Sequence, residues 1–145
     1  MTNDRYDKVR RINGLASDMD ALYHRAALKL GVPDSVMFVL YVLNDRGDGC
    51  LLYDICRETG ISKQTINSAM RKLEGEGILY LEQDKGKTKR VCLTEKGREY
   101  IDNTAARLFE AECRVFESWP EDEFEQYLHL MEKYNQGFRT ELERL

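Results

Sequence analysis

The sequence predicts a mainly α-helical protein with one small β-hairpin, in the α+β class. Apolar residues recur at helical spacing at both ends and in the middle of the chain, and one central stretch reads as two short strands around a turn. A chain of 145 residues with 42% hydrophobic residues can bury one moderate core. We therefore expect a single domain over residues 1–145, with helical regions at about 1–32 and 99–145 around a central region at 33–98.

The central region predicts two short helices joined by a tight turn. The first has a buried stripe at i, i+3, i+4 and i+7, formed by Leu52, Ile55, Cys56 and Thr59. Gly60 supplies the left-handed residue that ends it. Ser62 can accept a hydrogen bond from the free backbone N–H of Gln64 or Thr65, so a second helix is expected to run from about residue 63 to 74.

The second helix is expected to bury one side and expose a polar one. Its apolar stripe is Ile66, Ala69, Met70 and Leu73. The helical repeat then turns a polar set outward: Gln64, Asn67, Ser68 and Arg71. Ser62, Lys63 and Thr65 lie at the first turn of the same helix. Asn and Gln can bind adenine edges in pairs of hydrogen bonds, Arg can do so with guanine, and a helix N-terminus suits a phosphate. The alternative is an ordinary solvated helix face.

A basic hairpin follows this helix. Two strands are expected at Ile78–Glu82 and Lys89–Leu93, around a loop at 84–88. The loop and its exit carry four cations: Lys85, Lys87, Lys89 and Arg90. Such a hairpin beside a polar helix can lie along phosphates or enter the minor groove, which favours DNA binding over simple solvation of a charged loop.

The string from Ile55 through Ile101 resembles the winged helix-turn-helix of MarR-type bacterial transcription regulators. The match is specific at Gly60–Ile66, at Leu73–Ile78 and at Leu93–Gly97. This resemblance implies a DNA-binding regulator, most often a repressor, with a recognition helix at about 63–74, a wing at about 78–93 and terminal dimerisation helices. Two recognition helices about 34 Å apart would match a palindromic operator on double-stranded DNA.

The wing departs from the family pattern at its tip. Wings of this family commonly carry Asp-x-Arg there, with the Arg entering the minor groove, whereas this chain has Lys85-Gly86-Lys87. Lys87 is the nearest equivalent of that Arg, and the usual bracing carboxylate is missing unless Asp84 substitutes for it. Because lysine lacks the planar fork and is more strongly hydrated, we expect the wing contacts to be more purely ionic.

The net charge of −4 is unevenly distributed along the chain. Residues 61–98 carry 9 basic and 5 acidic side chains, whereas residues 99–145 carry 5 basic and 12 acidic ones. This segregation would turn the basic region toward DNA and make affinity fall steeply with salt. The acidic cluster after Pro120 is expected to stabilise a helix N-terminus.

Both ends of the chain carry long apolar stripes at helical spacing. The stripes are Val9, Ile12, Ala16, Met19, Tyr23, Ala26 and Leu30, and Phe124, Leu128, Met131, Phe138, Leu142 and Leu145, with Asn135 as a polar member that can set register. A chain of this size has little core to cover both stripes, so a homodimer is expected. Intramolecular packing is the alternative.

A long helix is expected to connect the central region with the C-terminal helical region, from a cap at Thr94 to about Ser118. Trp119-Pro120 marks its end, and Pro120 is expected in the first turn of the last helix. The resemblance implies that a small-molecule effector binds at such a junction. Five residues could line such a pocket, although aromatic residues at helical spacing are more often part of a core: Tyr23, Met37, Phe38, Tyr41 and Tyr53.

Other classes of function have little support. The four cysteines, Cys50, Cys56, Cys92 and Cys113, include no C-x-x-C pair, so no metal or cofactor is expected and a thiol switch is the weaker alternative. No phosphate loop or nucleophile elbow is present, so we do not expect an enzyme. A winged-helix module that binds a protein instead of DNA remains the main alternative.

The most apolar run, Val36–Leu43, is too short to cross a bilayer and is expected to be a buried helix behind the recognition unit. The N-terminus lacks an apolar signal segment, so a cytoplasmic location is expected.

Overall fold

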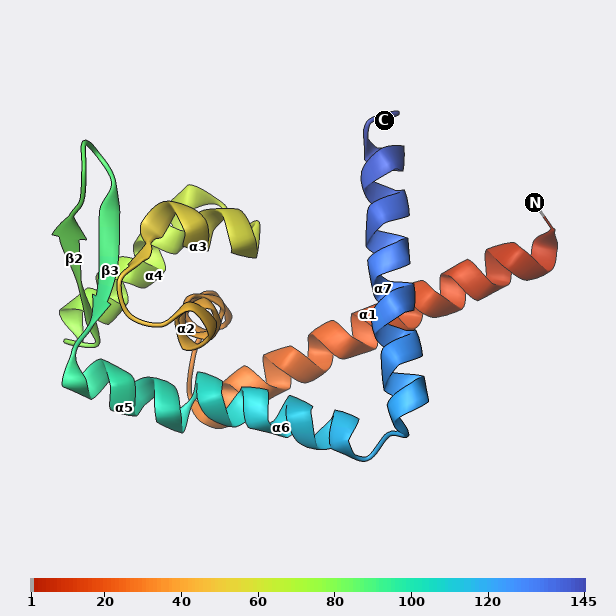
Figure 1. Cartoon of the computed structure of the whole chain (residues 1–145), viewed down its shortest axis with the longest axis horizontal. Helices are drawn as coiled ribbons and strands as arrows, with labels where there is room; N and C mark the ends of the chain where they lie inside the picture. Colours follow the sequence, from red (N-terminus) through yellow and green to blue (C-terminus); the bar gives the residue numbers. More distant parts are fainter. Residues whose placement is uncertain (1) are drawn as a thin grey trace. The chain divides into compact units, whose positions relative to one another are not determined.

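The computed structural model describes residues 2–145 and is mainly helical (Figure 1). It also contains a small antiparallel sheet of three strands. This confirms the predicted fold class. The elements in chain order are α1 (Asn3–Leu30), α2 (Asp34–Arg46), β1 (Cys50–Leu51), α3 (Leu52–Thr59), α4 (Lys63–Gly75), β2 (Leu79–Gln83), β3 (Lys89–Leu93), α5 (Glu95–Asn103), α6 (Ala105–Glu117) and α7 (Glu121–Leu142).

The chain divides into two compact units. The first ends at Leu108 and contains α1 to α5, and the second begins at Phe109 and contains most of α6 and all of α7. The expectation of one domain over residues 1–145 stays a prediction.

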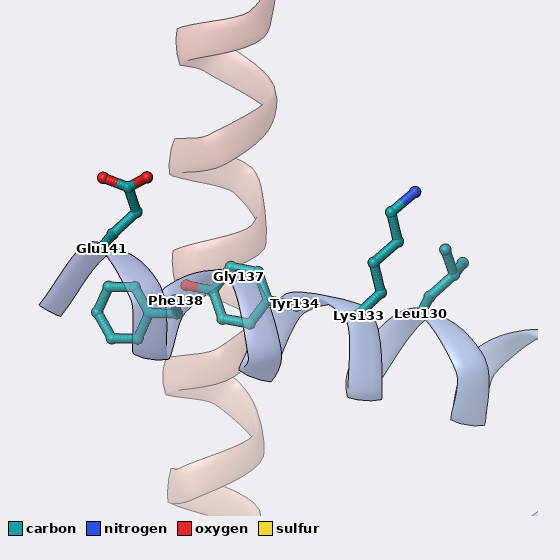
Figure 2. A pocket seen from close by; sticks show the side chains of 6 residues that line it. All are labelled: Leu130, Lys133, Tyr134, Gly137, Phe138 and Glu141. Carbon is teal, nitrogen blue, oxygen red and sulfur yellow. The ribbon is translucent and has the colours of Figure 1, made fainter. Parts of the chain in front are cut away.

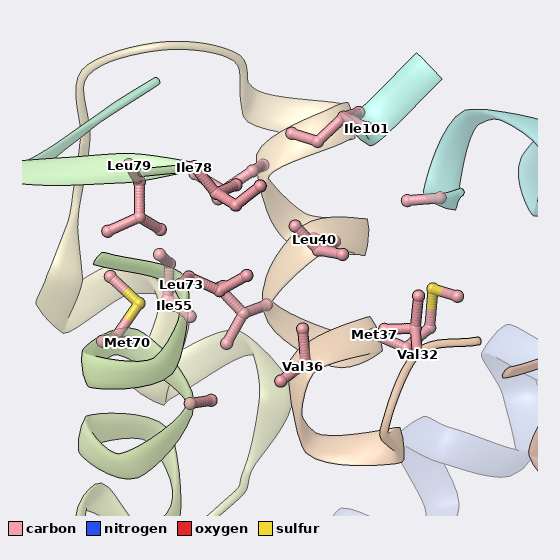
Figure 3. Packing of buried hydrophobic residues seen from close by; sticks show 14 of the residues in the cluster. Val32, Val36, Met37, Leu40, Ile55, Met70, Leu73, Ile78, Leu79 and Ile101 are labelled. Atoms are coloured by element: carbon pink, nitrogen blue, oxygen red, sulfur yellow. The ribbon is translucent and has the colours of Figure 1, made fainter. Parts of the chain in front are cut away.

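The core of the first unit is built around α2. Val39 and Leu40 are completely buried, and α2 packs against α3 and α4 as expected for a buried helix (Figure 3). Ile55, Leu73 and Ile78 extend the same cluster from α3, from α4 and from the segment that leads into β2. Burial of these large side chains stabilises the unit through the hydrophobic effect.

The helix pair α3 and α4 forms as its sequence predicts. Gly60 ends α3 with a φ of 64°. The Ser62 hydroxyl accepts a hydrogen bond from the Thr65 backbone N–H at 3.2 Å and begins α4. The predicted stripe of α4 is buried throughout: Ile66, Ala69, Met70 and Leu73. In the predicted stripe of α3, Ile55 is buried, whereas Leu52, Cys56 and Thr59 are half-buried.

The sheet has the strand order β1-β3-β2. The predicted hairpin forms with Tyr80 opposite Cys92, although its first strand begins at Leu79 and not at Ile78. The third strand, β1, was not expected, because two residues are too few to show strand alternation. Its Cys50 pairs with Val91, so the sheet includes a segment far away in sequence.

The expectation of one long helix from Thr94 to Ser118 is wrong. The cap at Thr94 is present, with its hydroxyl accepting from the Gly97 N–H at 2.9 Å, but the helix stops at Asn103 and α6 begins at Ala105. Between them, Thr104 is buried and has φ −127° and ψ −91°. Its hydroxyl donates to the Tyr100 carbonyl at 2.6 Å, a local bond that competes with the helical backbone pattern.

In the second unit, a turn at Trp119 and Pro120 separates α6 from α7. Pro120 lies just before the first residue of α7, one position earlier than expected. The turn is packed by aromatic rings: Phe116 stacks on Phe124 with centroids 4.6 Å apart, and Trp119 meets Tyr127 edge to face.

Among residues 2–145, no single helix is long and apolar enough to cross a membrane. The pair α1 and α2 passes that test only when joined across an 89° bend.

Candidate nucleic-acid interface

The outer face of α4 is polar and mostly accessible. Lys63, Gln64, Ser68 and Arg71 are exposed, and Asn67 is half-buried. The Arg71 guanidinium donates to the Ser68 hydroxyl at 3.2 Å, so these two side chains already lie together on the surface. A face of amides, a hydroxyl and a guanidinium offers the donors and acceptors that base edges require.

The start of α4 has a structural role besides any binding role. The Ser62 hydroxyl caps the helix, and it also donates to the Thr65 hydroxyl at 2.8 Å. Both side chains are exposed. Substitution of Ser62 would therefore remove a helix cap.

The β2–β3 hairpin forms the wing beside α3 and α4, with strand contacts to both helices (Figure 1). Lys85, Lys87 and Lys89 are exposed, and none of them forms an ion pair within residues 2–145. Their ammonium groups can therefore bind an anion without first breaking an internal ion pair.

Arg90 differs from these lysines because its guanidinium is bound within the unit. One nitrogen donates to the Gly49 carbonyl at 2.8 Å, and another lies 3.4 Å from a carboxylate oxygen of Asp84. Asp84 is thus paired at the base of the loop. Arg90 links the wing to the segment before β1, and any phosphate contact would be additional to that link.

Asp48 anchors the base of the wing and was missed by the sequence reasoning. Its carboxylate accepts from the Leu93 backbone N–H at 2.8 Å and from Arg98 at 2.9 Å. The hydrogen bond from Leu93 and the pairing with Arg98 hold the pKa of Asp48 below its usual value, against a smaller opposing effect of burial. No local motif marks this role, because Leu93 and Arg98 are 45 and 50 residues further along the chain.

The exit of the wing into α5 is closely packed. The Thr94 hydroxyl donates to the Gly77 carbonyl at 2.6 Å, and the Thr94 N–H donates to the Ile78 carbonyl at 3.1 Å. A Cβ atom at Gly97 would lie 1.9 Å from that same Ile78 oxygen. Only glycine therefore fits at the first turn of α5 without moving the start of the hairpin.

The five residues expected to line an effector site differ in how far they are buried. Met37 and Phe38 are adjacent on α2 but differ in exposure, since Met37 is 6% exposed and belongs to the core whereas Phe38 is 52% exposed. Tyr41 packs partly against the core, and Tyr23 and Tyr53 are exposed. The effector site stays a prediction.

The four cysteines are free thiols; Cys92 is buried, and the other three are half-buried. Burial raises the pKa of Cys50, and burial together with the nearby Glu82 raises that of Cys92. A raised pKa reduces the reactive thiolate, which disfavours a redox switch at these two positions. Within residues 2–145, no group of three His, Cys, Asp or Glu side chains could hold a metal ion.

The residues expected to form a dimer are exposed, with one exception. Val9, Ile12, Ala16 and Met19 on α1 are exposed, as are the four remaining residues on α7: Leu128, Met131, Phe138 and Leu142. Phe124 is the exception, because it is half-buried and stacks on Phe116 within its own unit. Figure 2 shows an open groove on α7 at Gly137, beside the stacked rings of Tyr134 and Phe138.

A helix pair with a polar outer face, followed by a hairpin with unpaired lysines, defines a winged helix-turn-helix protein. Residues 30–90 match the model of the MarR family. The resemblance to MarR-type regulators, first seen in the sequence, is therefore confirmed for the winged helix-turn-helix region.

Solved structures extend this similarity over most of the chain. A MarR-family transcriptional regulator from Silicibacter pomeroyi is 22% identical with a TM-score of 0.68, covering 85% of this chain and 84% of that one. MepR of S. aureus, solved as a complex with DNA, is 19% identical with a TM-score of 0.72, covering 94% and 99%.

PcaV of Streptomyces coelicolor, solved with its natural ligand, is 16% identical with a TM-score of 0.65, covering 84% and 89%. At these identities the structures establish a shared fold. No curated protein matches the chain.

Proposed function

We propose that this protein is a DNA-binding transcriptional repressor that acts as a homodimer on a palindromic operator and responds to a small-molecule effector. It is not proposed to be an enzyme, and no cofactor is assigned. The observation that carries the proposal is the polar outer face of α4 beside a wing whose lysines have no ion-pair partner among the described residues.

The proposal divides the contacts by chemistry. Gln64, Asn67, Ser68 and Arg71 would read base edges in the major groove, and Ser62, Lys63 and Thr65 would contact a phosphate at the start of α4. The wing would contact the sugar-phosphate backbone through Lys85, Lys87, Lys89 and Arg90. Salt should weaken this binding steeply, because each neutralised phosphate releases counterions.

The dimer is supported by the exposed apolar residues of α1 and α7. Met19 is 43% exposed and Ile12 57% exposed on α1, and Leu128 is 47% exposed on α7. A row of large apolar side chains in water is costly, and a second copy of the chain would cover it. Phe124 is left out of this proposed interface because it packs within its own unit.

The effector is supported only by likeness, since PcaV was solved with its natural ligand. The alternative of a protein-binding module has less support, because the exposed positions of α4 are polar or charged and offer no aromatic or aliphatic anchor.

The test is selection of bound fragments from a genomic DNA library, followed by affinity measurement on the recovered duplex at several salt concentrations. Recovery of a two-fold symmetric sequence with half-sites about one helical turn apart is expected. Mass measurement in solution should give a dimer. A monomer that ignores duplex DNA even in dilute buffer would refute the proposal.

A further inference from the structure

The tip of the wing is held by its own side chains, and Gln83 makes two of the contacts. Gln83 is the last residue of β2 and lies opposite Lys89. Its amide nitrogen donates to the Gly86 carbonyl at 2.5 Å and lies 3.3 Å from the Thr88 carbonyl. One amide group therefore joins the crest of the loop to its returning arm.

Two further bonds close the same loop. The Thr88 hydroxyl donates to the Lys85 carbonyl at 2.7 Å, and the Asp84 N–H donates to the Thr88 carbonyl at 2.9 Å. Gly86 takes a φ of 68°, which lets the chain turn at the crest. Three of the carbonyls in the loop are thus engaged from within the hairpin, those of Lys85, Gly86 and Thr88.

These contacts define the position of the two tip lysines. Lys85 and Lys87 flank the Gly86 carbonyl that Gln83 binds, and both side chains extend into solvent. Asp84 is not available as the brace of the tip, because its carboxylate lies beside Arg90. The backbone that carries the lysines is held instead by a neutral amide and a hydroxyl.

We propose that Gln83 is a positioning residue that orders the wing tip before DNA arrives, so that Lys85 and Lys87 are already presented to phosphates. This inference rests on the proposed function, in which the wing binds DNA. A loop that is ordered in the free protein loses less conformational entropy on binding. The smaller entropy loss makes the binding free energy more favourable. Gln83 itself carries no charge and does not alter the number of phosphates neutralised.

The test compares Gln83→Met, which has similar length but no donor, with Lys87→Ala. Gln83→Met should weaken duplex binding by about 3- to 10-fold at every salt concentration and leave the salt slope unchanged, because the cations remain. Lys87→Ala should lower the slope by about one phosphate contact. In the free protein, the backbone amides of residues 85–88 should be more mobile in Gln83→Met by heteronuclear NOE.

Thr88 provides an independent pair of variants. Thr88→Val removes the hydroxyl and should reproduce the effect of Gln83→Met, whereas Thr88→Ser keeps the hydroxyl and should bind like the parent protein. Circular dichroism should show equal helix content in all variants, since these residues are exposed.

The outcomes separate this inference from the proposed function. If the parent protein binds DNA while Gln83→Met binds equally well, or has a lower salt slope with unchanged loop mobility, the positioning role is refuted and the proposed function stands. If the parent protein binds no duplex, both fall together.

Discussion

Gly97→Ala gives the sharpest test of how the wing is held against α5 within the first unit. The new Cβ would lie 1.9 Å from the Ile78 oxygen, where real Cβ contacts are essentially never below 3.0 Å. The first turn of α5 and the start of the hairpin must therefore move apart by about 1 Å or more. The obstacle is backbone, so no side-chain rotation can relieve it.

The cost follows from the contacts that this movement disturbs. Overpacking of this kind typically costs about 1–3 kcal/mol. The bonds from Thr94 to Gly77 and Ile78, at 2.6 and 3.1 Å, lie at the same junction, and each contributes about 1 kcal/mol. Alanine regains up to about 1 kcal/mol of helix propensity. We expect a net loss of about 2–4 kcal/mol in the free energy of unfolding.

The assay is urea denaturation followed by far-UV circular dichroism at a fixed protein concentration. Fluorescence of Trp119 is unsuitable, because this sole tryptophan lies in the second unit. Gly75→Ala is the matched control: it adds a Cβ at the end of α4 with nothing within 4 Å and should be neutral or slightly stabilising. If Gly97→Ala is as stable as Gly75→Ala, the close approach does not constrain the wing.

Three further predictions concern binding and pH. Arg71→Ala should weaken binding to the preferred operator by about 1–3 kcal/mol and blur its sequence preference, measured by fluorescence anisotropy on matched and mismatched duplexes; equal losses on both duplexes would contradict a base contact. Lys87→Ala should weaken all duplexes alike and flatten the salt slope, whereas Lys29→Ala, which removes the same charge from α1, should leave that slope unchanged. Because the folded-state pKa of Asp48 lies below 3.8, its contribution to stability is present above that pH and is lost as the pH falls through the folded-state value. Urea melts across pH should therefore show Asp48→Asn less stable than the parent at neutral pH and similar to it in strong acid; a constant difference at all pH values would exclude the ionised carboxylate as the cause.

The sequence by itself determined those parts of the fold that depend on near neighbours. The cap at Ser62, the end of α3 at Gly60 and the buried stripe through Ile66 and Leu73 each rest on residues at most a few turns apart. The polar face of α4 follows from the same periodicity. Such features are readable because the spacing of residues along a helix places them on one side of it.

Tertiary structure decided what joins distant segments. β1 exists because Cys50 meets Val91, and Asp48 binds the wing only because folding brings Leu93 to it across 45 residues. The break at Thr104 depends on a buried position in the packed unit and has no proline or glycine to announce it. These features depend on packing and on hydrogen-bond partners that periodicity does not identify.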